Sequence, residues 1–201
     1  AYPRISIPII LAVSMALLSL LLGILLVHSR KTKEIRVMSE TDALTGLYNR
    51  RAAEDHISRQ MQEDGKNPDC VRPLISIDLD KFKQVNDTYG HLEGDALLIA
   101  VADTLRTSVR SYDIVGRIGG DEFVVYLSNV TDRQNAMAVA EKLCQVIRGL
   151  STMKKEWSNI SASIGISFAD HPDIKMEELY ISADKAMYSA KGNGRDQYQT
   201  L

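Results

Sequence analysis

Four carboxylates lie beside turns of the predicted sheet, where acidic side chains from different strands can meet. The run 74–80 is a short apolar strand that ends in two acids, Asp78 and Asp80. Because side chains alternate along a strand, both acids point to the same face. Two further acids, Asp121 and Glu122, lie in or just past a tight turn that contains two glycines. If that turn lies beside the first strand, Asp78 and Asp121 converge.

Two carboxylates at adjacent strand tips suit a magnesium ion. Mg²⁺ is a hard cation that prefers oxygen ligands and keeps several of its waters. Two carboxylates and one free backbone carbonyl therefore provide a sufficient set of protein ligands. The alternative is structural, because acids at strand ends also close turns and keep the surface soluble. The pattern alone leaves both interpretations open.

A hairpin is the clearest of the elements that position these acids. Gly119 and Gly120 separate two predicted strands, and successive glycines favour a hairpin because they tolerate positive φ. The predicted strands are 74–80, 112–118, 122–127 and 160–168, with a short edge strand at 197–199.

Four helices follow from apolar side chains that recur at the 3.6-residue period. The first begins after Asn49 as its N-cap and ends before Gly65, the second carries the apolar positions between 98 and 109, the third begins near Thr131, and the last ends at Gly192. Without the first and last helices, the element order is βαββαβ. This order predicts an α+β fold, a ferredoxin-like sandwich with helices on one face of an antiparallel sheet.

The charges are distributed unevenly along the 201 residues. The net charge is −2, but residues 1–39 carry +4 and residues 40–201 carry −6. An acidic main body argues against non-specific nucleic-acid binding, so we expect no nucleic-acid partner. A phosphorylated substrate would need cations recruited locally. Cys70 and Cys144 are far apart in the sequence, which argues against a disulfide framework or a zinc site and fits a reducing compartment.

Residues 5–27 form an uncharged, apolar run that predicts a transmembrane helix. At about 1.5 Å per residue such a helix spans roughly 35 Å, enough for a hydrocarbon core of about 30 Å. Four basic residues follow within 30–36, which by the positive-inside tendency places that side in the cytoplasm. A cleaved signal peptide is the alternative, but the run is too long and lacks a small-residue cleavage pattern. Residues 28–41 are then a connector, either a coiled-coil stalk or an ordinary helical linker, before a domain at 42–201.

Four ordered blocks of sequence resemble the GGDEF family of diguanylate cyclases. The signature is Gly-Gly-Asp-Glu-Phe at 119–123. The segment 42–51 is similar to the family's opening DxLTGLxNRR, 78–95 resembles its metal and guanine segment, and 183–195 resembles its closing segment. The similarity covers essentially all of 42–201, in the family's order and spacing.

The resemblance implies a metal-dependent activity that needs two copies of the domain. GGDEF domains condense two GTP molecules into cyclic di-GMP and release two pyrophosphates, each subunit of a homodimer holding one GTP. With the apolar segment 5–27, it implies attachment to the inner membrane of a bacterium, with the catalytic domain in the cytoplasm. The alternative within the family is a non-catalytic module that senses GTP or cyclic di-GMP and acts through protein partners.

The resemblance also implies roles for individual residues. Asp78, the carbonyl of Leu79 and Asp121 would ligate Mg²⁺ or Mn²⁺. Asn86 and Asp95 would bind the guanine edge, with His91 close to the base, whereas Lys83, Lys191 and Arg195 would hold the β- and γ-phosphates. Gly119 and Gly120 would let the backbone approach the nucleotide. With Asp121, Glu122 belongs to the catalytic pair and would assist deprotonation of the attacking hydroxyl or help to bind metal.

A further match concerns regulation by the product. Arg110 and Asp113 stand shortly before the signature, where many family members carry an RxxD product-inhibition site. There the arginine would clamp the phosphates and guanine of cyclic di-GMP, and the aspartate would accept from guanine. The alternative is a surface ion pair, which contributes well under ~1 kcal/mol.

Overall fold

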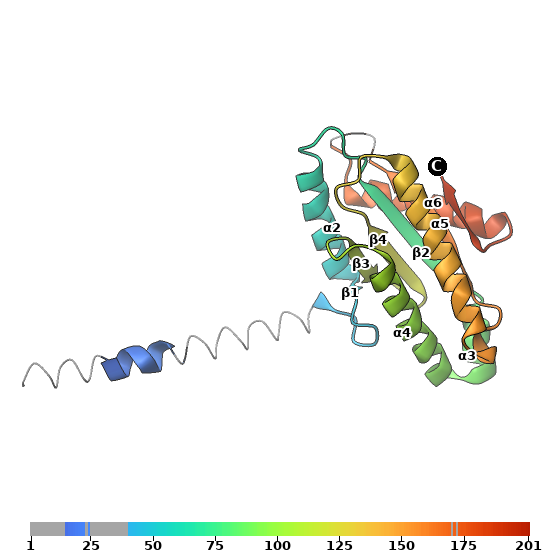
Figure 1. The fold of residues 1–201 in the computed structure, drawn as a ribbon, viewed down its shortest axis with the longest axis horizontal. Coiled ribbons are helices and arrows are strands. Elements are labelled where there is room, and N and C mark those ends of the chain that lie inside the picture. Colours follow the sequence, from blue (N-terminus) through green and yellow to red (C-terminus); the bar gives the residue numbers. More distant parts are fainter. Residues whose placement is uncertain (1–14, 23, 25–39, 170, 172) are drawn as a thin grey trace, which may run out of the picture. The chain divides into compact units, whose positions relative to one another are not determined.

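The computed structural model describes residues 15–22, 24, 40–169, 171 and 173–201 (Figure 1). The chain divides into two compact units, 1–40 and 41–201. In the first unit, residues 15–22 are helical and their side chains are exposed. Among the described residues, no helix is long and apolar enough to span a membrane. Most of the predicted membrane segment 5–27 and of the connector 28–41 lies outside the described residues.

The second unit is built on a six-stranded sheet. Its strands in spatial order are β1 (Tyr48–Asn49), β3 (Ile114–Arg117), β4 (Glu122–Tyr126), β2 (Pro73–Asp80), β5 (Ser161–Phe168) and β6 (Gln197–Thr200). The four central strands pair antiparallel with one another, whereas the edge strands β1 and β6 pair in parallel with β3 and β5. The complete sheet is therefore mixed, and the antiparallel sheet predicted for the βαββαβ core is confirmed in its four central strands.

Five α-helices surround this sheet among the described residues of the unit. They are α2 (Arg50–Asp64), α3 (Phe82–Tyr89), α4 (His91–Ser108), α5 (Arg133–Gly149) and α6 (Met176–Gly192), with short 3₁₀ turns at Leu150–Thr152 and Lys155–Trp157. The predicted N-cap of the first helix is confirmed, because the Asn49 side chain accepts the Ala52 N–H at 3.0 Å. Helix α3 was not predicted: it buries only Phe82 and Val85, too few positions for a periodic pattern.

The predicted βαββαβ core is confirmed as β2, α4, β3, β4, α5 and β5. Helices α4 and α5 both lie on the face of the sheet seen in Figure 1. The prediction of helices on one face was made for this core and holds for it, whereas in the complete unit α2 and α6 pack on the opposite face. A second covered face follows from the central strands, whose apolar side chains point to both sides.

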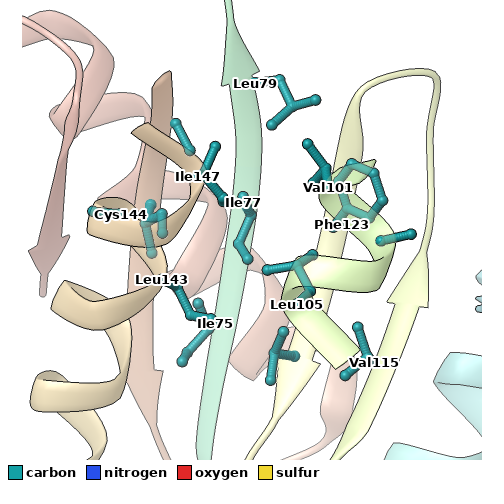
Figure 2. Close-up of a cluster of buried hydrophobic side chains, with 14 of the residues drawn as sticks. Ile75, Ile77, Leu79, Val101, Leu105, Val115, Phe123, Leu143, Cys144 and Ile147 are labelled. Atoms are coloured by element: carbon teal, nitrogen blue, oxygen red, sulfur yellow. The ribbon is translucent and has the colours of Figure 1, made fainter. Parts of the chain in front are cut away.

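Strand β2 shows how this two-sided core is arranged. All eight of its residues are buried. Ile75, Ile77 and Leu79 face α4 and α5, where they pack with Leu105 and Leu143 (Figure 2).

The alternate positions of β2 face the other way, towards α6. The Ser76 hydroxyl lies 3.6 Å from the Met187 sulfur, and Asp78 pairs with Lys191 one helical turn later. Helix α6 sits directly on Gly165 of β5, where an added Cβ would overlap backbone atoms of Ala183 and Met187. This close approach brings α6 within reach of the acidic end of β2.

Candidate active site

The structure brings the acidic end of β2 and the glycine turn together, as the sequence predicts. Asp78 is paired in register with Glu122 across the antiparallel β2–β4 contact. At the next position the Leu79 N–H donates to the Asp121 carbonyl at 3.2 Å. Three carboxylates, those of Asp78, Asp121 and Glu122, therefore lie where the central strand β2 ends and the central strand β4 begins. We call this end of the sheet the acidic edge.

Asp78 experiences opposing electrostatic effects at this edge. It is 8% exposed, and burial raises the pKa of its carboxyl above the usual value. The ammonium of Lys191, 2.7 Å away, lowers that pKa, while the charges of Asp121 and Glu122 raise it further. The net direction is upward, so the fold alone does not fully compensate the negative charge at this position.

The donors at this edge fit a hard divalent cation. Clustered carboxylates that disfavour one another's charge are stabilised by a cation, and oxygen is the ligand atom that Mg²⁺ prefers. Within the described part of the chain, no group of three or more histidine, cysteine, aspartate or glutamate residues could hold a metal ion unaided. An ion held by Asp78, Asp121 and the Leu79 carbonyl would therefore take further ligands from water and from phosphate oxygens, as Mg²⁺ commonly does.

Two guanidinium groups hold the glycine turn in shape. Arg117 donates to the Gly120 carbonyl through Nη2 at 2.8 Å, and Arg50 donates to the Ile118 carbonyl through Nε at 2.9 Å. The turn closes through the Ile118 N–H, which donates to the Glu122 carbonyl at 2.9 Å. The backbone beside Asp121 is thus fixed before any ligand binds.

The reason for glycine in this turn differs from the one predicted. Neither Gly119 nor Gly120 has a positive φ. At Gly119 the absence of a Cβ leaves space for the Glu122 carboxylate, because a Cβ would lie 2.6 Å from one of its oxygens and displace that side chain. A Cβ at Gly120 would meet no atom of the described residues within 4 Å, so packing does not require glycine at that position.

Asp42, in the segment before β1, helps to hold the glycine turn through Arg117. Arg117 also pairs with Asp42 at 3.0 Å, and Asp42 accepts from the N–H and the hydroxyl of Thr45 at 2.9 and 2.6 Å. Burial alone would raise the pKa of Asp42, but the Thr45 hydrogen bonds and Arg117 outweigh it and lower the pKa. Sequence reasoning assigned no role to Asp42, Arg50 or Arg117. The Asp-x-x-Thr spacing is the available signal, because it is typical of a side chain that caps a turn.

The predicted guanine residues gather where α3 meets α4. Asn86 lies on α3, and its side-chain amide occupies the space where Gly94 of α4 lacks a Cβ. Asp95 follows Gly94 in α4, and His91 is its first residue; both are exposed. The chain bends between the helices at Gly90, whose φ is +87°. Asn86 and the start of α4 are therefore brought together.

The three predicted phosphate cations are placed differently. Lys191 lies beside Asp78, and Arg195 has its Nε 3.8 Å from Asp80, so both stand at the end of β2. Lys83 is exposed on α3, which begins directly after that strand. Local cations are thus present at the acidic edge of a domain with net negative charge.

Arg110 and Asp113 form a turn at the opposite end of β3 from the glycines. At about 3.3 Å per residue, the four-residue strand separates the two turns by roughly 13 Å. Asp113 accepts from the N–H groups of Arg110 and Ser128 at 2.8 and 3.0 Å, and burial raises its pKa despite these bonds. The Arg110 side chain is exposed and donates to the Tyr112 hydroxyl at 2.9 Å. The pair thus organises a backbone turn beside a depression of about 500 Å³.

The sequence is similar to one family of known proteins. The profile described as "Diguanylate cyclase, GGDEF domain" matches residues 39–197. The chain is 39% identical over 170 residues to the bifunctional diguanylate cyclase/cyclic di-GMP phosphodiesterase MucR of Pseudomonas aeruginosa, covering 85% of this chain and 24% of that protein. It is 34% identical to the diguanylate cyclase DgcS of Shewanella oneidensis, covering 87% of this chain and 57% of that protein. The chain thus spans between a quarter and somewhat over half of these relatives.

Solved structures share the fold. The coiled coil and GGDEF domain of DgcB from Caulobacter crescentus, in complex with c-di-GMP, align with a TM-score of 0.79 at 24% identity, covering 98% of this chain and 100% of that one. The active GGEEF domain of a diguanylate cyclase from Vibrio cholerae aligns with a TM-score of 0.69 at 30% identity, covering 76% and 96%.

Proposed function

Because the chain belongs to the GGDEF family of diguanylate cyclases, we propose that its unit 41–201 condenses two GTP molecules into cyclic di-GMP. The observation that supports this most directly is the pairing of Asp78 with Glu122, beside the Leu79–Asp121 hydrogen bond. This pairing places carboxylates that could hold a metal ion next to the ammonium of Lys191. A nucleoside triphosphate would need both the metal ion and the ammonium to neutralise its phosphates. All the acids of the signature are present, which disfavours a non-catalytic sensor.

The reaction consists of two equivalent nucleotidyl transfers. In each, the 3′-hydroxyl oxygen of one GTP forms a bond to the α-phosphorus of the other, the bond from that phosphorus to the β-phosphate oxygen breaks, and pyrophosphate leaves. Mg²⁺ or Mn²⁺, when bound, would neutralise phosphate charge. Asp78, Asp121 and the Leu79 carbonyl would hold the ion. Glu122 accepts the hydroxyl proton or, in the alternative role, helps to hold the ion. Lys83, Lys191 and Arg195 bind the β- and γ-phosphates and so orient the leaving group.

A direct assay tests this proposal. The purified chain incubated with GTP and Mg²⁺ should produce cyclic di-GMP, measured by chromatography, and two pyrophosphates per product, measured as phosphate after treatment with a pyrophosphatase. Asp121→Ala should reduce the rate at least about a hundredfold, because it removes a ligand of the metal ion that neutralises the phosphate charge. Binding of GTP without any turnover by the unchanged chain would favour the sensing alternative.

The base should be selected by Asn86 and Asp95. A carboxylate accepts from the N1–H and N2–H₂ groups of guanine, which adenine lacks. Asp95→Ala should therefore reduce the preference for GTP over ATP by about ten- to a hundredfold in kcat/KM. An unchanged ratio of the two kcat/KM values would exclude Asp95 from base recognition.

Regulation, assembly and location are further parts of the proposal. Product binds at the depression beside Arg110 and Asp113 and inhibits the enzyme. The productive unit is a homodimer, because one GTP is held by each subunit. The uncharged run 5–27 and the basic residues after it favour anchoring in the inner membrane of a bacterium, with the catalytic unit in the cytoplasm.

A further inference from the structure

A buried carboxylate without an assigned role lies two residues beyond Asp78. The Asp80 side chain is only 1% exposed. It accepts from the hydroxyls of Ser161 and Ser163 on β5, at 2.8 and 2.7 Å, and from the Asp196 N–H at 3.1 Å. Asp80 therefore ties the central strand of the sheet both to β5 and to a segment more than a hundred residues later in the chain.

The segment that Asp80 holds is the turn 194–196, between α6 and β6. Its three residues have φ values of +111°, +67° and +52°, and only the first is glycine. Aspartate tolerates this left-handed region better than most residues, whereas arginine is uncommon there and needs surrounding contacts to hold it. The bond from the Asp196 N–H to Asp80 is one such contact. The other is Arg148 of α5, whose Nε lies 2.9 and 2.7 Å from the two carboxylate oxygens of Asp196.

The middle residue of this strained turn is Arg195. Its side chain is 55% exposed and available to a ligand, yet its Nε stays 3.8 Å from the Asp80 carboxylate. Lys191, four residues earlier, lies beside Asp78. Two cations thus stand beside two acids of the β2 end: Lys191 on the last turn of α6 pairs with Asp78, and Arg195 in the turn that follows α6 lies near Asp80.

We propose that Asp80 is a positioning residue for nucleotide binding. It fixes the turn 194–196 against the end of β2, so that the Arg195 guanidinium stands with Lys191 at the phosphate end of the site. The inference rests on the proposed function, because a triphosphate substrate is what gives Arg195 its ligand. Asp80 acts through Arg195 and not by contact with the nucleotide.

Nucleotide binding by the full chain tests this role. The probes are the α,β-methylene analogue of GTP, which cannot be cleaved at the reacting position, and GMP, which lacks the β- and γ-phosphates. Isothermal titration calorimetry with Mg²⁺ should show that Asp80→Asn raises the Kd of the triphosphate about tenfold, as expected for a hydrogen-bonded charge. The Kd of GMP should change less than about twofold, because base and ribose contacts are untouched.

Two serines of β5 provide a second variant and its matched control. Ser163→Ala removes one bond to Asp80 and should raise the Kd of the triphosphate about threefold. Ser167→Ala removes an equally buried hydroxyl that donates to the Leu179 carbonyl at 2.7 Å, and should leave both Kd values unchanged. If Asp80→Asn does not fold, the comparison of these two serines decides the question.

A double-variant comparison separates positioning from general support. If Asp80 acts through Arg195, adding Asp80→Asn to Arg195→Ala should raise the Kd of the triphosphate by less than about twofold. Losses that multiply in the double variant, or equal weakening of GMP and the triphosphate, would overturn the proposal. A chain that binds neither nucleotide and makes no cyclic di-GMP would overturn both the proposed function and this inference. If the unchanged chain makes cyclic di-GMP and the Asp80→Asn variant makes it at the same rate, the inference alone is overturned.

Discussion

Single side chains in this protein support the site by holding backbone groups. Arg50 and Arg117 bind carbonyls of the glycine turn, and Asp42 holds Arg117 in place. None of these three was assigned by sequence reasoning, yet each fixes the position of Asp121. The catalytic edge therefore depends on residues that lie outside the signature.

Acid stability should report the Asp42 contact. The pKa of Asp42 is lowered in the fold, so its stabilising effect is complete above the unfolded value near 3.9 and is lost as the pH falls through the folded value. Asp42→Asn should reduce the free energy of unfolding by about 1 kcal/mol at pH 7, with the difference shrinking below pH 4. Urea unfolding between pH 7 and pH 3 measures this. A difference that is as large at pH 3 as at pH 7 would show that the charge is not involved.

Cys144 illustrates a residue that the fold makes inert. Burial raises the pKa of its thiol to about 12, so at pH 8 only about one molecule in ten thousand carries the thiolate. In a Cys70→Ser background, a thiol reagent should label the native protein far more slowly than the urea-unfolded protein. Rapid labelling of the native state would contradict the burial of this side chain in α5.

At the scale of elements, glycines set how closely helices approach their neighbours. Gly165→Ala would drive a Cβ into the backbone of α6 at Ala183 and Met187, which cannot move independently. Overpacking of this kind should destabilise the protein by about 1–3 kcal/mol in urea unfolding and displace Lys191 from Asp78. Gly149→Ala is the control, because its Cβ would meet nothing within 4 Å, and stability should rise slightly. Equal stability of the two variants would argue against close packing of α6 on β5.

A change at the contact between α3 and α4 should affect KM for GTP more than the stability of the protein. A Cβ at Gly94 would overlap the side-chain amide of Asn86, which can rotate away because it is the flexible end of a side chain. Gly94→Ala should therefore unfold at nearly the same urea concentration as the unchanged chain, while KM for GTP rises about tenfold from the displaced Asn86. A large loss of stability with an unchanged KM would show that the amide does not bind the base.

At the scale of the whole molecule, the proposed reaction requires two catalytic units. In that proposal the reacting hydroxyl and the reacting phosphate belong to different GTP molecules, each bound to one copy. Specific activity should therefore fall on dilution, as the dimer dissociates. For the isolated unit 41–201 the fall should begin at higher protein concentration than for the full chain if residues 1–40 bring copies together, because a tether raises the effective concentration. Activity per molecule that is constant over a hundredfold dilution of a monomeric protein would contradict this assembly.

The local features of this protein were determined by its sequence. The Asn49 cap, the strand that ends in Asp78 and the hairpin before Glu122 follow from side-chain chemistry and periodicity within a few residues. These features sufficed to predict the βαββαβ core and the meeting of the two acidic strand ends. The short elements β1 and α3 were missed because each buries too few side chains to leave a pattern.

Contacts between distant segments were decided only by the tertiary structure. Asp80 meets a turn 116 residues later, and Arg117 meets Asp42 across 75 residues. Such pairs depend on which face of the sheet each helix covers and how closely it packs, and Gly165 sets that distance for α6. Periodicity identifies an apolar face but not its partner, because many helices could cover the same strand. The acids of the site can therefore be identified from the sequence. The long-range hydrogen bonds and ion pairs that hold them in place form only when the distant segments pack together.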